Sequence, residues 1–153
     1  VVKHAFDTAE HSDGNEHELV SALRNSDAFI PELSLVAEMN GKIAGHILFT
    51  KVHIGNRTEL ALAPLSVLPE YQKQGIGKAL ISEGHRIARE LGYSFSIVLG
   101  SEHYYPKSGY YPTSDFGIIS PFDVPDANFM AISLNGSTAK IDGTVKYAKE
   151  FGI

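Results

Sequence analysis

The chain has 153 residues, which is enough for one domain with a hydrophobic core and too few for two ordinary domains. It contains no cysteine, which excludes disulfides, thiolate metal sites and a cysteinyl acyl-enzyme intermediate. Its 13 Lys+Arg against 18 Asp+Glu give a formal net charge of −5, so the electrostatic signature of a nucleic-acid-binding protein is missing. No apolar run is long enough to cross a bilayer, and no signal-peptide pattern opens the chain. We therefore expect a single cytoplasmic domain over residues 1–153, with neither a nucleic-acid nor a membrane partner.

The first residues carry a helical pattern, since Val2, Ala5 and Phe6 have the spacing of one apolar helix face. Two interpretations stay open: the end of a helix whose beginning is absent, or a frayed terminus. A polar stretch over residues 7–16 follows and predicts a loop.

A helix and a meander of strands are expected next. The helix is predicted over residues 16–25, with Leu19, Val20 and Leu23 on one side. Three strands are predicted at 34–39, 42–54 and 59–68, and Asn40-Gly41 is a strong hairpin signal between the first two. Pro64 lies inside the third strand and cannot donate to the ladder, so that strand should be bulged or unpaired there.

The second half of the chain contains the clearest helix, over residues 75–91, with Gly92 at the position of a C-terminal cap. A strongly apolar strand at 95–99, a short helix or turn at 103–108 and a strand at 129–134 follow it. This order predicts a mixed α/β fold, in which an antiparallel meander is joined to one strand–helix–strand crossover.

The segment most informative about function is the loop Gln72-Lys73-Gln74-Gly75-Ile76-Gly77-Lys78, between a predicted strand and a predicted helix. The first amides of a helix have no internal partner and carry the positive end of its dipole, so they form an anion site. The two glycines would let a bulky anion approach the backbone closely. A plain glycine-rich turn explains the glycine pair about equally well on these residues alone.

Two other phosphate-binding loops do not fit this segment. A Walker A loop requires Ser or Thr after the lysine, whereas Ala79 follows Lys78. A Rossmann fingerprint requires a third glycine at position 80, which is leucine.

Three blocks in the right order extend the pattern: Val67-x-Pro69-x-Tyr71, then Gln72-x-x-Gly75-x-Gly77, then Tyr104-Tyr105-x-x-x-Gly109-Tyr110. With these blocks, essentially the whole chain resembles the GNAT superfamily of N-acetyltransferases. The resemblance implies a sheet that is splayed at a bulge and flanked by helices, with part of the family's N-terminal strand and helix absent here. It also implies acetyl-CoA as cosubstrate and no metal. In that family the pyrophosphate is bound by the amides that correspond to residues 72–78, and pantetheine by the backbone of Leu65 and Val67.

The implied reaction moves an acetyl group to a primary amine of a small molecule or peptide, by direct attack in a ternary complex. Tyr105 matches the family tyrosine that protonates the leaving thiolate, while Tyr104 is better explained by packing. The amides of Leu65 and Val67 are the expected oxyanion donors. A homodimer is the common expectation for such an enzyme. A non-catalytic acyl-CoA-binding or sensor domain of the same fold is the alternative.

The general base is not determined by the sequence. Glu38 is our first candidate, because a carboxylate buried in an apolar strand would have a raised pKa and a functional purpose, and neither if it points to solvent. His53, Glu59 and His103 also lie on predicted strands or strand ends. A water chain without a single base is an equal alternative.

Overall fold

The computed structural model describes residues 16–136 and 140–151. The helical pattern at Val2, Ala5 and Phe6, and most of the polar loop after it, lie outside these described residues.

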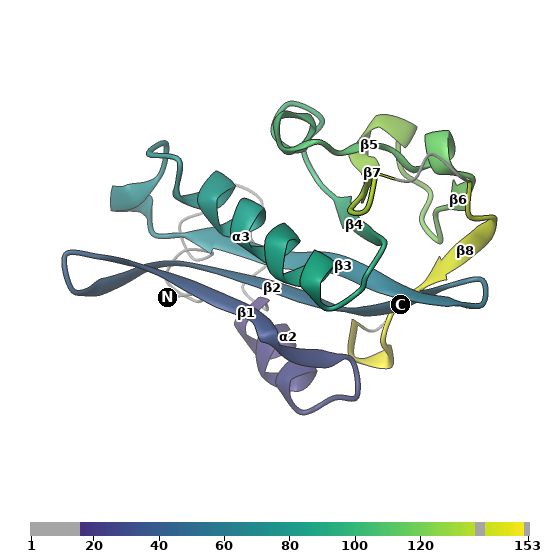
Figure 1. Ribbon diagram of the computed structural model, residues 1–153. Coiled ribbons are helices and arrows are strands. Elements are labelled where there is room, and N and C mark those ends of the chain that lie inside the picture. The colour runs from purple at the N-terminus through teal and green to yellow at the C-terminus, as the bar shows by residue number, and fades with distance from the viewer. Residues whose placement is uncertain (1–15, 137–139, 152–153) are drawn as a thin grey trace.

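The first part of the described chain contains the long elements (Figure 1). They are α2 (Glu16–Arg24), β1 (Phe29–Met39), β2 (Lys42–Ile54), β3 (Arg57–Val67), α3 (Ile76–Glu90) and β4 (Phe95–Leu99). Four short strands follow, which are β5 (Tyr111–Pro112), β6 (Ile118–Ile119), β7 (Phe129–Ser133) and β8 (Gly143–Lys146). Single turns of 3-10 helix occupy Pro69–Tyr71, Tyr105–Ser108, Thr113–Phe116, Asp126–Asn128 and Lys149–Phe151.

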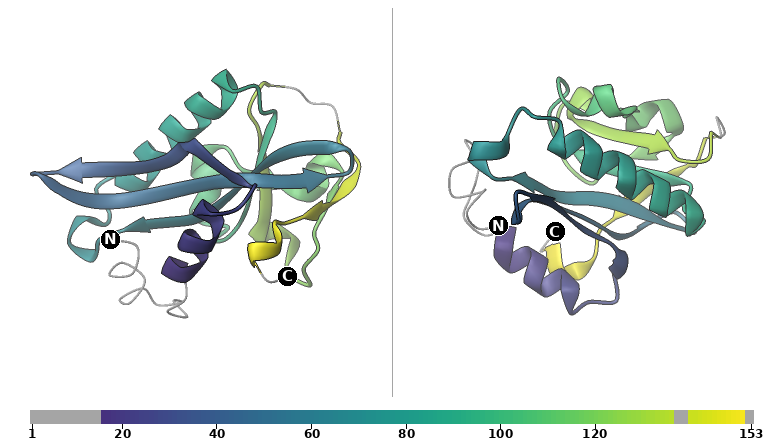
Figure 2. Two further views of the ribbon diagram at one scale, coloured as in Figure 1. Left: turned by 90° about the horizontal axis from the view of Figure 1, so that it is seen from below. Right: turned by 60° about the vertical axis from the view of Figure 1, so that its left-hand side comes forward.

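All the strands belong to one mixed sheet with the order β5-β7-β4-β3-β2-β8-β6, and β1 pairs with β2 beside β8. β1, β2 and β3 form the antiparallel meander, and β3 and β4 are parallel neighbours joined through α3. α3 covers one face of the sheet and α2 the other (Figure 2). The predicted mixed α/β fold is therefore confirmed.

β3 is bulged where the sequence predicted it. Ile47 pairs with Leu65 and Phe49 with Leu62, so two steps along β2 correspond to three steps along β3. The extra residue lies at Ala63–Pro64, where proline cannot donate to the ladder. On its other side β3 pairs with β4 only through Leu60 and Ala61. The two parallel strands therefore separate beyond Ala61, on the side of the bulge that leads to α3.

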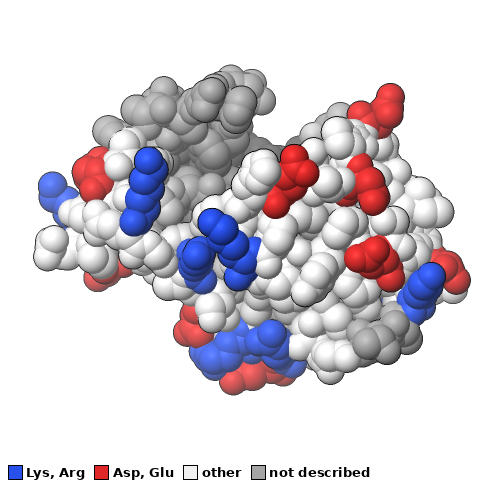
Figure 3. Space-filling view, turned by 90° about the horizontal axis from the view of Figure 1, so that it is seen from above, with Lys and Arg blue, Asp and Glu red and all other residues white. Residues whose placement is uncertain are grey.

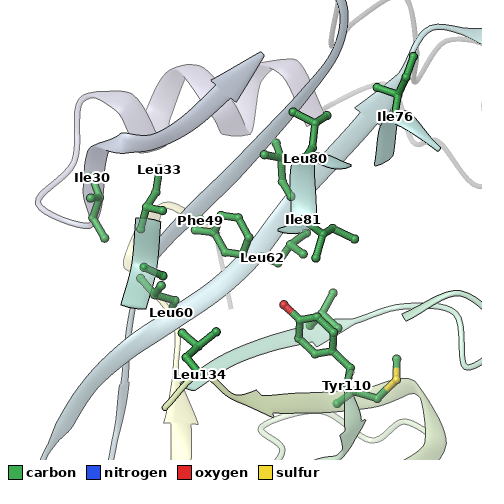
Figure 4. Packing of buried hydrophobic residues seen from close by; sticks show 14 of the residues in the cluster. Ile30, Leu33, Phe49, Leu60, Leu62, Ile76, Leu80, Ile81, Tyr110 and Leu134 are labelled. Atoms are coloured by element: carbon green, nitrogen blue, oxygen red, sulfur yellow. The ribbon is translucent and has the colours of Figure 1, made fainter. Parts of the chain in front are cut away.

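The main core lies between α3 and the sheet (Figure 4). Phe49 and Leu62 project from β2 and β3 toward Leu80 and Ile81 of α3, and all four side chains are buried. Gly84 lets the helix approach closely, because a Cβ at this position would overlap the Phe49 ring. The absence of a side chain at Gly84 thus sets the distance between α3 and the sheet.

Replacing Gly84 by leucine is expected to lower the free energy of unfolding by about 2 kcal/mol or more, because the side chain overfills a packed interface. For a chain of this size the melting temperature should fall by roughly 5 °C. Thermal unfolding followed by circular dichroism measures this. Ala79→Leu, an exposed position of the same helix, is the control and should melt close to the wild type. Equal melting temperatures for both variants would contradict this account of the interface.

Candidate active site

The start of α3 leaves several backbone amides without a helical partner. Gly75 precedes the helix with a φ of 83°, in the left-handed region where glycine is favoured. The hydrogen-bond ladder begins with the Ala79 N–H, which donates to Gly75 O over 3.0 Å. The amides of Gly77 and Lys78 precede that first bond. In this fully described segment neither a capping side chain nor an acidic residue occupies the first turn, so nothing neutralises its partial positive charge.

A pocket of about 440 Å³ opens onto this helix start. The end of β3, the loop, the first turn of α3 and the segment before the 3-10 helix at 105–108 contribute its walls. The lining residues are Leu65, Val67, Tyr71, Gln72, Lys73, Gly75, Ile76, Gly77, Lys78 and Tyr104. The structure thus brings together every residue that the sequence proposed for cofactor binding except Gln74.

Two glutamine side chains hold the loop in place. Gln72 donates from Nε2 to the carbonyl of Val67 over 2.8 Å, and Gln74 donates to the carbonyl of Glu70 over 3.3 Å. Gln74 therefore fixes the loop and does not line the pocket. Lys73 between them has a φ of 65°, a conformation that is costly for a residue with a Cβ and is often found where a loop binds a ligand.

The edge of β3 facing the splayed strand carries unpaired backbone groups. The Leu68 N–H donates to Ala44 O of the β2 side over 2.7 Å. Because backbone groups alternate in direction along a strand, the N–H and C=O of Leu65 and Val67 point the other way, toward the gap. The bond from Gln72 to the outward-facing Val67 carbonyl agrees with this direction. Leu65 and Val67 thus offer a strand edge without a strand partner.

Tyr104 lies over the start of α3. Its hydroxyl sits so close to the Gly77 Cα that a Cβ at position 77 would overlap it. The sequence assigned Tyr104 to packing, and no local pattern indicated that its hydroxyl would reach the cofactor loop. The fold alone brings its hydroxyl to the pocket.

The Tyr105 ring lies between the rings of Tyr104 and Tyr110. Its ring meets the Tyr104 ring edge-to-face at 5.0 Å and the Tyr110 ring at 5.8 Å. Burial raises the pKa of Tyr105 to about 12, so its hydroxyl keeps its proton at neutral pH. The pocket lining, as far as the described residues define it, includes Tyr104 and not Tyr105.

A buried hydrogen-bond network anchors this group of tyrosines. The Tyr110 hydroxyl is 2.9 Å from His85 Nε2 of α3 and 2.8 Å from Ser96 Oγ of β4. Desolvation, with a smaller contribution from Arg89, lowers the pKa of His85 to about 4, so the imidazole is neutral. The network joins the helix, the splayed strand and the tyrosine segment through uncharged groups.

Positive charge continues beside the pocket. A second groove, of about 350 Å³, shares Lys78 with it and is also lined by Arg89 and Lys107. Figure 3 shows the face that carries α3, with a cluster of Lys and Arg side chains near its centre. Among the described residues, no three His, Asp or Glu side chains are arranged to hold a metal ion. None of the helices in the described part of the chain is long and apolar enough to cross a membrane.

Comparison with known proteins decides the family. Residues 3–110 match the model of the acetyltransferase (GNAT) family. The chain is 36% identical over 141 residues to the uncharacterized N-acetyltransferase YjhQ of Escherichia coli K12, covering 87% of this chain and 78% of that protein. The chain belongs to the GNAT acetyltransferase family. The resemblance read from the sequence motifs is therefore confirmed.

Two solved structures share the fold of this GNAT acetyltransferase. One is a GNAT family acetyltransferase from Brucella melitensis in complex with acetyl-CoA, with a TM-score of 0.79, 33% identity, and coverage of 99% of this chain and 87% of the other. The second is YhbS from Escherichia coli in complex with CoA, with a TM-score of 0.88, 24% identity, and coverage of 99% and 85%.

The base candidates of this GNAT acetyltransferase lie away from the pocket. Glu38 is exposed on β1, close to the Asn40-Gly41 turn, so the burial that would have made it a base is not present. His53 and His103 are exposed as well. None of these side chains is among the residues that line the pocket in the described part of the chain.

Glu59 is buried, but its carboxylate is already engaged. It accepts the Ser94 and Phe95 amides at 2.9 and 3.1 Å and the Arg57 guanidinium at 3.0 Å. These bonds tie the start of β4 to β3, at the end of the strand pair opposite the bulge. Glu59 therefore has a structural role in joining the two strands.

Proposed function

We propose that the chain is an acetyl-CoA-dependent N-acetyltransferase that acetylates a primary amine by direct attack in a ternary complex. The observation that carries this proposal is the pocket at the start of α3, where free amides and a missing Cβ face a cavity lined by lysines. The Brucella relative, which is 33% identical and in complex with acetyl-CoA, supports the same cosubstrate.

The residues present fit that cosubstrate. The amides from Lys73 to Lys78 would bind the pyrophosphate, because unpaired helix-terminal N–H groups favour an anion. The Gln72 N–H already donates to Pro69 O over 3.3 Å. The outward N–H groups of Leu65 and Val67 and the C=O of Leu65 would bind the pantetheine amides as a neighbouring strand does. An unpaired N–H at this edge would also stabilise the oxyanion that forms during acyl transfer. The bound cosubstrate supplies the acetyl group as a thioester.

Tyr105 is our proposed general acid for the departing thiolate, from its match to the family motif, and Tyr104 is proposed to bind the cosubstrate. Tyr105→Phe should lower kcat about 100-fold and leave the Kd of acetyl-CoA nearly unchanged. Tyr104→Phe should raise that Kd about fivefold through one lost hydrogen bond, with kcat retained. Steady-state kinetics and calorimetric titration separate the two roles. The reverse assignment follows if Tyr104→Phe is the variant that loses turnover.

The proposed reaction is tested by free thiol release from acetyl-CoA in the presence of amines, peptides and aminoglycoside antibiotics. The protein has no cysteine, so it adds no thiol background. Amine-dependent release above spontaneous hydrolysis, with mass spectrometry of the acetylated amine, is the expected result. Acetyl-CoA that raises the melting temperature without any release would instead favour the non-catalytic binding domain.

A further inference from the structure

Two buried polar side chains lie side by side on the sheet face opposite α3. His46 of β2 and Ser66 of β3 are paired in register, and they are only 2% and 4% exposed. Neither His46 Nδ1 nor Ser66 Oγ has a hydrogen-bond partner among the described residues. Buried polar atoms are nearly always paired, because an unpaired one loses its bond to water on folding. Two such atoms on neighbouring strands form a polar pair to which a ligand group could donate hydrogen bonds.

One of the two neutral tautomers of His46 makes this site a hydrogen-bond acceptor. Its Nε2 is 3.3 Å from Ser34 Oγ of β1, which orients the ring. Desolvation, with a smaller contribution from Arg24, lowers the pKa of His46 to about 4, so the imidazole is neutral. When Nε2 carries the proton and donates to Ser34, Nδ1 is left with a free lone pair.

The pair lies next to the reactive strand edge. Ser66 stands between Leu65 and Val67, whose backbone groups face the gap and whose side chains line the pocket on the α3 side. A Cβ at Gly45 would contact Ile76 and Leu80 of α3, so the neighbouring His46 faces the other side. Leu48, the next residue of β2 on that side, packs against α2. Ser66 thus flanks the gap and His46 lies one strand farther from it, both on the face opposite the cosubstrate pocket.

Resting on the proposed function, we propose that His46 Nδ1 and Ser66 Oγ bind the acceptor's primary amine, which reaches the gap from the face of the sheet that carries α2. An uncharged, buried acceptor pair favours the neutral amine over the ammonium ion, since burial disfavours charge. The neutral amine is the form that attacks a thioester. Binding it in this form removes the need for a carboxylate that deprotonates the ammonium ion. The proton that the nitrogen loses after attack goes to water, and Tyr105 protonates the departing thiolate.

Ser66→Ala should raise the KM for the amine about tenfold and leave the Kd of acetyl-CoA unchanged. It should also keep or raise the melting temperature, because it removes an unpaired buried hydroxyl. Thr50→Val is the matched control: Thr50 Oγ1 is also buried without a partner, on the same face of β2 but farther from the gap. Thr50→Val should stabilise the protein equally and leave the KM unchanged. Equal KM values for both variants and the wild type would overturn the proposal.

A second measurement does not depend on turnover. Protein with ¹⁵N-labelled histidine, saturated with CoA, is titrated with n-butylamine, and n-butanol is the control. The His46 Nδ1 resonance should shift with the amine and not with the alcohol. A shift without any turnover supports the subsite and contradicts the proposed enzyme. Turnover without a shift contradicts the subsite alone, and the absence of both contradicts both.

Discussion

Replacing Gly77 by leucine is expected to raise the Kd of acetyl-CoA at least about 100-fold, which corresponds to about 2.7 kcal/mol of binding free energy. The new side chain would enter the pocket at the start of α3 and displace the Tyr104 hydroxyl, which now lies against the Gly77 Cα. Folding should be affected little, because leucine has a higher helix propensity than glycine and the tip of Tyr104 can move aside. Isothermal titration with acetyl-CoA measures the loss, and thermal unfolding measures the stability.

Ala79→Leu is the matched control for this change. Ala79 lies in the same turn of α3 but is exposed and outside the pocket lining. Its replacement should leave the Kd of acetyl-CoA within about twofold of the wild type, since no lining group is displaced. Wild-type affinity in Gly77→Leu would show that the cosubstrate does not approach the start of this helix.

Lowering the pH from 7 to 5 is expected to lower the free energy of unfolding by several kcal/mol, about 2 from each of two buried histidines. Desolvation is the main reason that the pKa values of His46 and His85 fall from 6.5 to about 4 in the folded protein. Between pH 6.5 and 4 the unfolded chain therefore binds protons that the folded protein does not. The stability is fully present above pH 6.5 and is lost as the pH falls through this window. Urea unfolding at a series of pH values measures the slope.

Two variants test whether His85 causes part of this pH dependence of the free energy of unfolding. His85→Gln keeps an amide near the Tyr110 hydroxyl but cannot titrate, so it should remove about half of the pH dependence. His103→Gln removes an exposed histidine and should leave the slope unchanged. A pH dependence that survives in His85→Gln at full strength would contradict the assignment to His85.

Local patterns predicted the elements that are bounded by clear signals. β2 and β4 begin and end at the predicted residues, because each is a run of strand-forming residues between turns. β1 begins at Phe29, five residues before the predicted start, and includes Pro31. The pairing of β1 with β2 is irregular between Phe29 and Ser34, and this irregularity accommodates the proline in an edge strand.

Three of the short strands, β5, β6 and β8, escaped prediction for a different reason, whereas β7 was predicted. β8, for example, is only Gly143–Lys146 and contributes a single buried side chain, Val145, whose partner Ile54 lies some ninety residues earlier in the chain. Four residues are too few to give a periodic signal, so their pairing depends on the rest of the sheet.

The candidate site was predictable where its chemistry is local. The Gln72–Lys78 loop was found because a helix start and its glycines are contiguous in sequence. The exposure of Glu38, the position of the Tyr104 hydroxyl and the pairing of His46 with Ser66 depend on strand register and tertiary packing. A single sequence does not contain those distances, so these residues became visible only in the fold.

The most direct test of the proposed cosubstrate site is a titration of ¹⁵N-labelled protein with acetyl-CoA, followed through the backbone amide resonances. We expect the amides of Gly75, Gly77 and Lys78 to shift most, together with those of Leu65 and Val67 at the strand edge. Shifts concentrated on another face, with these amides unmoved at saturation, would contradict the assignment of the cosubstrate to the start of α3.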